Sequence, residues 1–160
     1  MSDRAIATVR GFCTSWAGEE PERMLDFFAD DAVWIDGDRD VHRGKAALRK
    51  ELLAQRMAVG PVFMELVTVL SDGRTVLTER IDTNVLDGRE FPLKVAGAFE
   101  VDDDGLITRW QDYFDEAGFM RQLQDADVPE TMEAMANRYA EALRMLGDAD
   151  GPSSVAADSV

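Results

Sequence analysis

Cysteine, histidine and long apolar runs are all scarce in this sequence of 160 residues. The single Cys13 has no partner for an internal disulfide, which suits a reducing cytoplasm. With one cysteine and one histidine, the chain does not supply the ligand sets of zinc sites, so we expect no metal. No apolar run is long enough to span a bilayer, and no basic segment precedes an apolar one at the start. We therefore expect neither a membrane protein nor a signal peptide.

Basic residues are also in the minority. The sequence has 17 Lys and Arg against 32 Asp and Glu, which gives a formal net charge of −15. So acidic a chain is repelled by phosphates, and we expect no binding to nucleic acid or to anionic membranes. The chain is nevertheless 46% hydrophobic, and its length suffices for one domain with a sizeable core.

The spacing of apolar residues predicts the order of helices and strands. Helices are expected over residues 4–16, from about 20 to 29, and over 45–58, 116–124 and 130–146. Strands are expected over residues 32–36, 62–70, 75–86, 92–101 and 106–115. Asp-Gly turns between the last four strands predict a meander of hairpins. Helices grouped ahead of an antiparallel sheet indicate an α+β fold, in which a curved sheet wrapped by the helices leaves a cone-shaped cavity.

Three parts of the chain are expected to differ in organisation. Residues 1–124 are predicted to form the cone-shaped α+β domain. Residues 125–147 form an extension helix, which caps the cavity or packs on another subunit. Residues 148–160 are small, acidic or polar, and are expected to be disordered.

The candidate catalytic residues lie on two of the predicted strands. Arg80 and Asp82 are two residues apart and therefore share a face, as do Trp110, Asp112 and Phe114. If these faces meet, an Arg lies with two Asp in a largely apolar cavity. Such an Arg can keep one carboxylate ionised while the other holds a proton, which suits a reaction that adds one proton and removes another. For the first pair alone, an exposed salt bridge is the alternative.

The segments 77–82, 95–101 and 105–115, read together, resemble the limonene epoxide hydrolase family. The resemblance covers about residues 4–124. It implies the cone-shaped α+β fold shared with nuclear transport factor, ketosteroid isomerase and small polyketide cyclases. It also implies a homodimer through the outer face of the sheet and a reaction without cofactor.

The resemblance assigns a role to each member of the charged group. Asp112 takes a proton from water, the water attacks an epoxide carbon, Asp82 protonates the epoxide oxygen, and Arg80 bridges the two carboxylates. The implied substrate is an epoxide of a mostly apolar small molecule, and no covalent intermediate forms. A largely dry pocket would raise the pKa of the acid enough to keep it protonated.

The first strand departs from the family pattern. Where the family positions its water with a Tyr and an Asn, this chain has Trp34 and Asp36. An indole only donates hydrogen bonds, whereas Asp36 accepts them but adds a third carboxylate. Trp34, Trp110 and Phe114 are then expected to line the substrate and water pocket, with Asp36 among the catalytic residues.

An acidic residue at this position resembles the polyether epoxide-opening cyclases of the same fold. The alternative function is therefore an intramolecular epoxide-opening or polyketide-tailoring cyclase, with Glu65 as a possible partner of Asp36. A non-catalytic binding module is a third class. Solvent exposure is the favoured interpretation for Glu65, and packing at the surface or in a loop is favoured for His42.

Simple strand alternation gives the remaining expectations. Glu79 and Asp115 point away from the faces that carry the charged group, and are expected to be structural or solvent-facing. Tyr113 points away from Asp112 and is expected to pack under the helices. Cys13 is expected to be a small buried hydrophobe on its helix.

Overall fold

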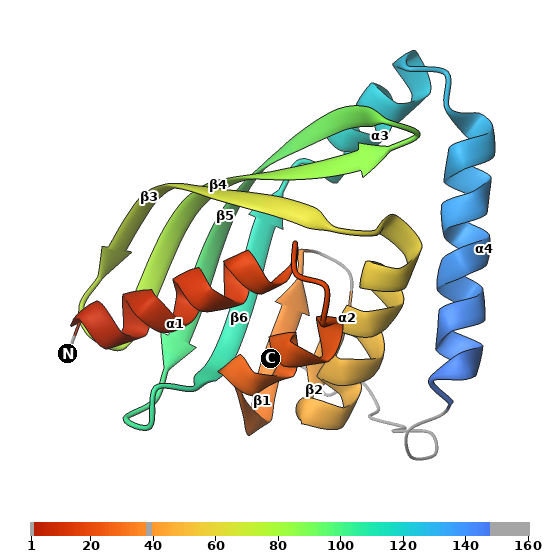
Figure 1. Cartoon of the computed structure of the whole chain (residues 1–160). Coiled ribbons are helices and arrows are strands. Elements are labelled where there is room, and N and C mark those ends of the chain that lie inside the picture. Colours follow the sequence, from red (N-terminus) through yellow and green to blue (C-terminus); the bar gives the residue numbers. More distant parts are fainter. Residues whose placement is uncertain (1, 38–39, 148–160) are drawn as a thin grey trace, which may run out of the picture.

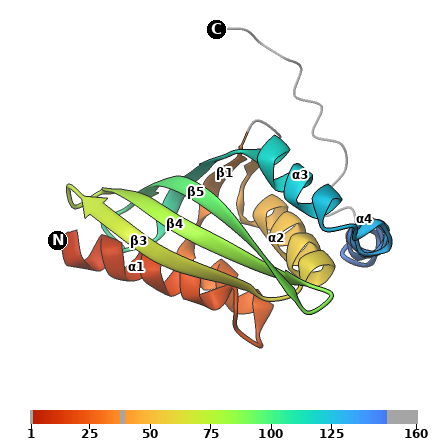
Figure 2. The same ribbon diagram turned by 90° about the horizontal axis from the view of Figure 1, so that it is seen from above.

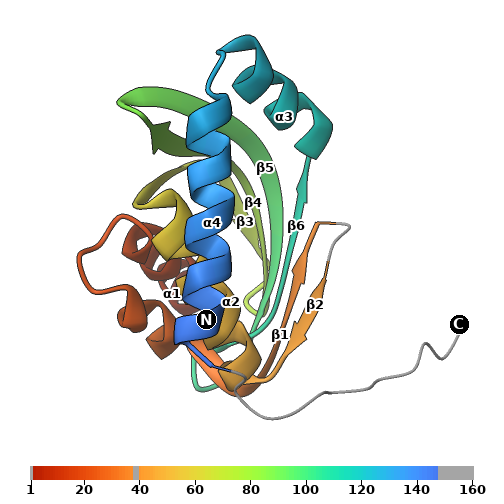
Figure 3. The ribbon, with the colours of Figure 1, turned by 90° about the vertical axis from the view of Figure 1, so that its right-hand side faces the viewer.

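A strongly curved six-stranded sheet, with helices against its concave face, organises the chain in this computed structural model (Figures 1 and 3). The structure describes residues 2–37 and 40–147. The elements follow in the order α1 (Ser2–Ser15), the 3-10 helix η1 (Pro21–Phe27), β1 (Phe28–Asp36), β2 (Val41–Arg43), α2 (Lys45–Val59), β3 (Val62–Ser71), β4 (Thr75–Leu86), β5 (Arg89–Val101), β6 (Ile107–Phe114), α3 (Glu116–Asp125) and α4 (Pro129–Met145). The α+β class predicted from the sequence is confirmed.

The strand order is β2-β1-β6-β5-β4-β3. Strands β3 to β6 form the predicted antiparallel meander. Between β4 and β5 the chain reverses through Asp87 and Gly88, both with positive φ, which is the conformation of a type I′ hairpin turn. Strand β1 runs parallel to β6, with Asp36 opposite Asp112. This long-range pairing brings the first strand beside the last one.

The main core fills the space between the helices and the concave face of the sheet. Phe12 of α1 is its centre, and its ring meets Phe28 and Trp110 edge to face at centroid distances of 4.9 Å each. Cys13 is buried on the same helix, as predicted. A second, smaller core under α3 and α4 contains Leu86, Phe91, Leu123 and Val128.

Three details of the predicted elements were wrong. The second helix is a 3-10 helix that ends at Phe27, and Phe28 starts β1 instead of closing the helix. Phe28 has extended backbone angles and is fully buried, because its side chain packs against Phe12 in the main core. Residues 41–43 form the edge strand β2, and β5 begins at Arg89 rather than at residue 92.

For side chains away from the concave face of the sheet, some predicted placements are confirmed and one is wrong. Glu65 and Glu79 are exposed on the outer face, as expected. Tyr113 was predicted to pack under the helices and is instead 54% exposed, because its alternation away from Asp112 directs it to the outer face. Asp115 accepts a hydrogen bond from the backbone N–H of Gly118 and so caps the start of α3.

Two further findings bear on the predicted organisation. The predicted tail, residues 148–160, and two residues of the turn after β1 lie outside the described residues. Within the described part of the chain, no helix is both long and apolar enough to span a membrane.

Candidate active site

Arg80, Asp82 and Asp112 form one hydrogen-bonded group, which we call the charged triad. The Nε of Arg80 donates to Asp82 at 2.8 and 3.1 Å. Its Nη1 and Nη2 donate to the two oxygens of Asp112 at 2.9 and 2.5 Å. The three residues are between 1% and 6% exposed. The structure therefore brings together the three charged residues that the sequence placed on two separate strands.

A glycine between the two strands makes this contact possible. Strand β5 lies between β4 and β6, so the Arg80 side chain has to cross β5 to reach Asp112. It crosses at Gly97, which lies opposite Asp112 in β6 and opposite Thr78 in β4. A Cβ on residue 97 would lie 2.5 Å from Arg80 Nη1, closer than any normal contact. Gly97 thus leaves the space that the guanidinium occupies.

The two carboxylates of the triad have different surroundings. Asp112 accepts three hydrogen bonds, two from Arg80 and one from the indole N–H of Trp110 at 2.7 Å. Within residues 2–37 and 40–147, Asp82 accepts only from the Nε of Arg80. Because N–H donors stabilise the ionised form, this asymmetry favours the charge on Asp112 and the proton on Asp82. An ionised carboxylate has about four acceptor positions, so Asp112 keeps one for a further donor such as water.

The pKa directions agree with this assignment. Burial raises the pKa of Asp82, and the neighbouring Arg80 opposes the rise without cancelling it. Burial by itself would lower the pKa of Arg80, but the charges of Asp112 and Asp82 outweigh it and raise that pKa. Arg80 therefore stays charged, and burial favours the protonated form of Asp82.

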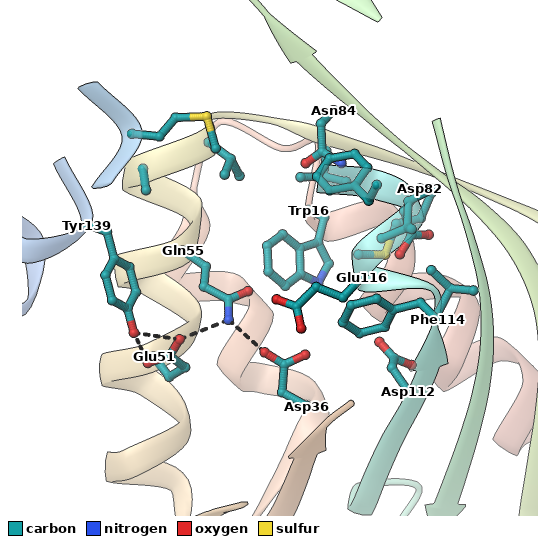
Figure 4. A pocket seen from close by; sticks show the side chains of 18 of the residues that line it. Trp16, Asp36, Glu51, Gln55, Asp82, Asn84, Asp112, Phe114, Glu116 and Tyr139 are labelled. Atoms are coloured by element: carbon teal, nitrogen blue, oxygen red, sulfur yellow. Dashed lines mark hydrogen bonds between the residues drawn. The ribbon is translucent and has the colours of Figure 1, made fainter. Parts of the chain in front are cut away.

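Asp36 extends the polar part of the site onto β1. It is opposite Asp112 in the parallel pairing of β1 and β6, and is 7% exposed. The amide Nε2 of Gln55 on α2 donates to Asp36 at 3.1 Å and to Glu51 at 2.9 Å. Figure 4 shows Asp36 and Asp112 directed into the same pocket from neighbouring strands.

Aromatic rings form one wall of this pocket. The rings of Trp34 and Trp110 stack with centroids 4.5 Å apart and an interplanar angle of 2°. The ring of His42 on β2 lies 5.1 Å from that of Trp34. His42 was expected at the surface or in a loop; it lies on a strand and lines the pocket, because β2 pairs with β1. Phe114 is half-buried at the pocket wall.

The pocket has a volume of about 610 Å³ and contains every residue of the predicted site in its lining. Two buried indole N–H groups in this lining, those of Trp16 and Trp34, have no hydrogen-bond partner among residues 2–37 and 40–147. They are available to donate to an oxygen of a bound molecule. Glu65 lies outside the pocket, since its neighbour Met64 faces Asp82 across β3 and β4 while Glu65 points outward.

Sequence reasoning missed several polar residues of the pocket, namely Trp16, Glu51, Gln55, Glu116 and Tyr139. Glu51 and Gln55 stand four residues apart in α2, a spacing that places them on one face of a helix. That signal was present in the sequence. The contact with Tyr139 depends on the position of α4 and had no local signal.

The architecture is the cone-shaped α+β fold of ketosteroid isomerase-like proteins. One solved structure of that fold, from Catenulispora acidiphila, covers 72% of this chain and 90% of its own, with 19% identity and a TM-score of 0.65. Residues 9–110 match the SnoaL-like domain, and the chain belongs to that family. The predicted family relationship is confirmed.

Two relatives from Mycobacterium tuberculosis are more similar in sequence. Epoxide hydrolase EphG is 34% identical over 109 residues, which are 67% of this chain and 70% of the relative. A solved LEH-like epoxide hydrolase is 32% identical and covers 80% of this chain and 98% of its own, with a TM-score of 0.64. At 15% identity, SalBIII shares the fold, covering 72% of this chain and 93% of its own with a TM-score of 0.64. SalBIII is described as an epoxide hydrolase/cyclase-like enzyme of pyran ring formation in the polyether salinomycin.

Proposed function

We propose that the protein is a cytoplasmic epoxide hydrolase, independent of cofactors, that adds water to an epoxide of a mostly apolar small molecule in one concerted step. The buried contact of Arg80 with Asp82 and Asp112 carries this proposal. The named epoxide hydrolase relatives support it. A non-catalytic binding module would have no use for two buried carboxylates around one cation, which are costly to desolvate.

The proposed step moves two protons in opposite directions. Asp112 accepts a proton from a water molecule, whose oxygen forms a bond to one epoxide carbon. The carbon–oxygen bond of the ring breaks, and its electron pair stays on the epoxide oxygen, which takes the proton of Asp82. The product is a diol. The triad is neutral as a whole before and after the step, since Arg80 stays charged while the proton changes carboxylates.

The water is proposed to lie in the pocket, between the side chains of Asp36 on β1 and Asp112 on β6. Asp36 stands opposite Asp112 and accepts the second hydrogen of the water, while the unpaired N–H of Trp34 donates to its oxygen. In this proposal Trp34 and Asp36 take the place of the Tyr and Asn with which the limonene epoxide hydrolase family positions its water. This arrangement holds the water on the side of the cavity where Asp112 keeps an acceptor position.

The second candidate is an intramolecular epoxide-opening cyclase. The carboxylate of Asp36 beside Asp112 favours it, because a second base could deprotonate a hydroxyl of the substrate. The exposed position of Glu65 argues against the partner first considered for Asp36. The two candidates share the acid, Asp82, and differ in the nucleophile.

A panel of epoxides separates these candidates. Simple apolar epoxides, and matched epoxides that carry a hydroxyl four or five atoms from the ring, are incubated with the protein, and diol and cyclic ether are quantified. Hydrolysis predicts diol from both sets. Cyclic ether from the hydroxy epoxides, with no diol from the simple ones, would replace hydrolase by cyclase. No turnover of any member would overturn both.

We also propose a homodimer through the outer face of the sheet. This face exposes Phe63, Val67, Leu70, Leu77 and Tyr113, a group of large apolar side chains of the kind that marks an interface. Sedimentation equilibrium should give twice the chain mass, and Leu77→Glu should give a monomer. A monomeric wild-type protein would refute the assembly but not the chemistry.

A further inference from the structure

Helix α4 lies outside residues 9–110, the part that matches the family, yet it lines the candidate active site. Figure 3 shows α4 standing across the front of the concave side, and Figure 2 shows it end-on beside α2 and α3. Met132, Met135 and Tyr139 of this helix line the pocket, together with Met120 of α3. The side of the pocket formed by α3 and α4 is therefore rich in methionine.

Hydrogen bonds fix α4 on the core domain. The hydroxyl of Tyr139 donates to Glu51 of α2, with its oxygen 2.7 and 2.9 Å from the two carboxylate oxygens. Glu51 in turn accepts from Gln55, which also donates to Asp36. Arg138 Nε donates to the carbonyl of Ala58 at 3.0 Å. A chain of hydrogen bonds thus runs from α4 through α2 to the candidate water-holding residue on β1 (Figure 4).

The size of the pocket leaves room for more than the reacting ring. Its volume of about 610 Å³ equals that of about twenty water molecules at roughly 30 Å³ each. Methionine side chains are flexible and polarisable, and they adapt to apolar groups of different shape. The wall that they form is suited to a flexible hydrocarbon group rather than to one rigid shape.

We propose that α4 is the specificity-determining wall of the active site, and that the substrate is an epoxide with a flexible apolar chain of several carbons that lies against Met132 and Met135. Tyr139 is a positioning residue, which holds this wall through Glu51. The proposal rests on the proposed function only where it calls the substrate an epoxide. Binding of the apolar chain by Met132 and Met135 does not depend on the reaction.

Unreactive n-alkyl primary amides, from butanamide to decanamide, test the wall by titration calorimetry on the full chain. Affinity should rise about fourfold for each methylene that becomes buried, until the chain fills the pocket. Met135→Trp should weaken the long amides at least tenfold and leave butanamide unchanged, while Met135→Ala should extend the rise to longer chains. Met145→Trp is the matched control, because Met145 is on the same helix but 69% exposed.

The outcomes separate the wall from the reaction. Wild-type affinity that does not depend on chain length, or an equal loss for short and long amides in Met135→Trp, would overturn the proposal. If the amides bind with an affinity that depends on chain length but matched epoxides are not turned over, the proposed function is refuted and the proposal about α4 stands. For the hydrogen bond from Tyr139 to Glu51, Tyr139→Phe should raise KM for long-chain epoxides more than KM for short ones. An equal change for both chain lengths would mean that Tyr139 acts only on stability.

An independent observation concerns Trp16, which follows α1. It is 4% exposed, and its indole N–H, which has no partner in the described chain, belongs to the pocket lining. Its backbone carbonyl accepts from Arg56 and from the N–H of Val62, which fixes its position. Figure 4 shows the indole reaching into the pocket between Gln55 and Glu116. A buried donor without a partner is costly, so a ligand that supplies an acceptor gains there.

We infer that the substrate carries a second oxygen, separate from the epoxide, that accepts the Trp16 N–H. Alkyl amides in which an ether oxygen replaces one methylene, at each position in turn, test this with ¹⁵N-labelled protein. One isomer should move the Trp16 indole N–H resonance downfield, and its all-carbon analogue should not. Trp16→Phe should weaken that isomer about tenfold relative to the analogue. Equal resonance shifts from the ether and its analogue, or an equal loss of both in the variant, would overturn the inference.

Discussion

Replacing Gly97 by alanine perturbs the charged triad without substituting any of its members. The new Cβ would lie 2.5 Å from Arg80 Nη1, 2.7 Å from Thr78 Oγ1 and 2.9 Å from the ring of Phe99. Arg80 is 1% exposed and cannot move aside into solvent, so its hydrogen bond from Nη1 to Asp112 has to lengthen or break. The backbone of residue 97 does not have positive φ, so the contact, and not the backbone, is the source of the cost.

The expected magnitude follows from these contacts. Overpacking a filled core costs about 1–3 kcal/mol, and separating a buried ion pair costs about 3–5 kcal/mol when one charge loses its partner entirely. Arg80 keeps its contact with Asp82, so we expect a loss of about 3 kcal/mol in the free energy of unfolding. For a chain of this size that lowers Tm by about 6–12 °C. Epoxide turnover should fall at least tenfold, because the bridge between the acid and the base is displaced.

Thermal and urea unfolding, followed by circular dichroism, measure the change. Ala96→Val is the matched control, because Ala96 is the neighbouring residue of β5 on the exposed face, and its Tm should stay within about 2 °C of the wild type. A double-mutant cycle tests whether the new Cβ acts through Arg80. Gly97→Ala should lower the free energy of unfolding much less in an Arg80→Met background than in the wild type. A Tm and a turnover rate equal to those of the wild type in Gly97→Ala would refute the reasoning about the triad.

Three further predictions follow from the site. Burial raises the pKa of Asp82, so kcat should fall as pH rises through that pKa. The free energy of unfolding should fall over the same range, because the folded protein binds this proton more tightly than the unfolded chain. A kcat that does not change with pH would remove Asp82 as the acid. Activity should survive dialysis against EDTA; loss that a divalent ion restores would make the carboxylates metal ligands. Burial raises the pKa of Cys13 to about 12, so iodoacetamide at pH 8 should label it only in urea, and labelling of the native protein would contradict its buried position.

Strand alternation made part of the site predictable. Arg80 and Asp82 were placed on one face because they stand two residues apart, and the same rule joined Trp110, Asp112 and Phe114. The hairpin turn at Asp87 and Gly88 could also be predicted, because it has a local signal. These predictions needed no knowledge of distant contacts.

The missed features depend on tertiary structure. Phe28 belongs to a short apolar run, whose periodicity does not distinguish a helix end from a buried strand start. The parallel pairing of β1 with β6 aligns Asp36 with Asp112 across 76 positions of the sequence, and no local pattern predicts it. The role of Gly97 becomes visible only once β5 is known to lie between β4 and β6. Tyr139 reaches Glu51 only because α4 packs beside α2.

A comparison of Asp112→Asn with Asp36→Asn, assayed for diol formation from one apolar epoxide, tests the central claim most directly. Asp112→Asn keeps the shape of the side chain but removes the base, and should lower kcat about 10²–10⁴-fold. Asp36→Asn still offers an amide oxygen to the water and should retain substantial hydrolysis. Inactive Asp36→Asn together with active Asp112→Asn would contradict the account and move the chemistry to β1.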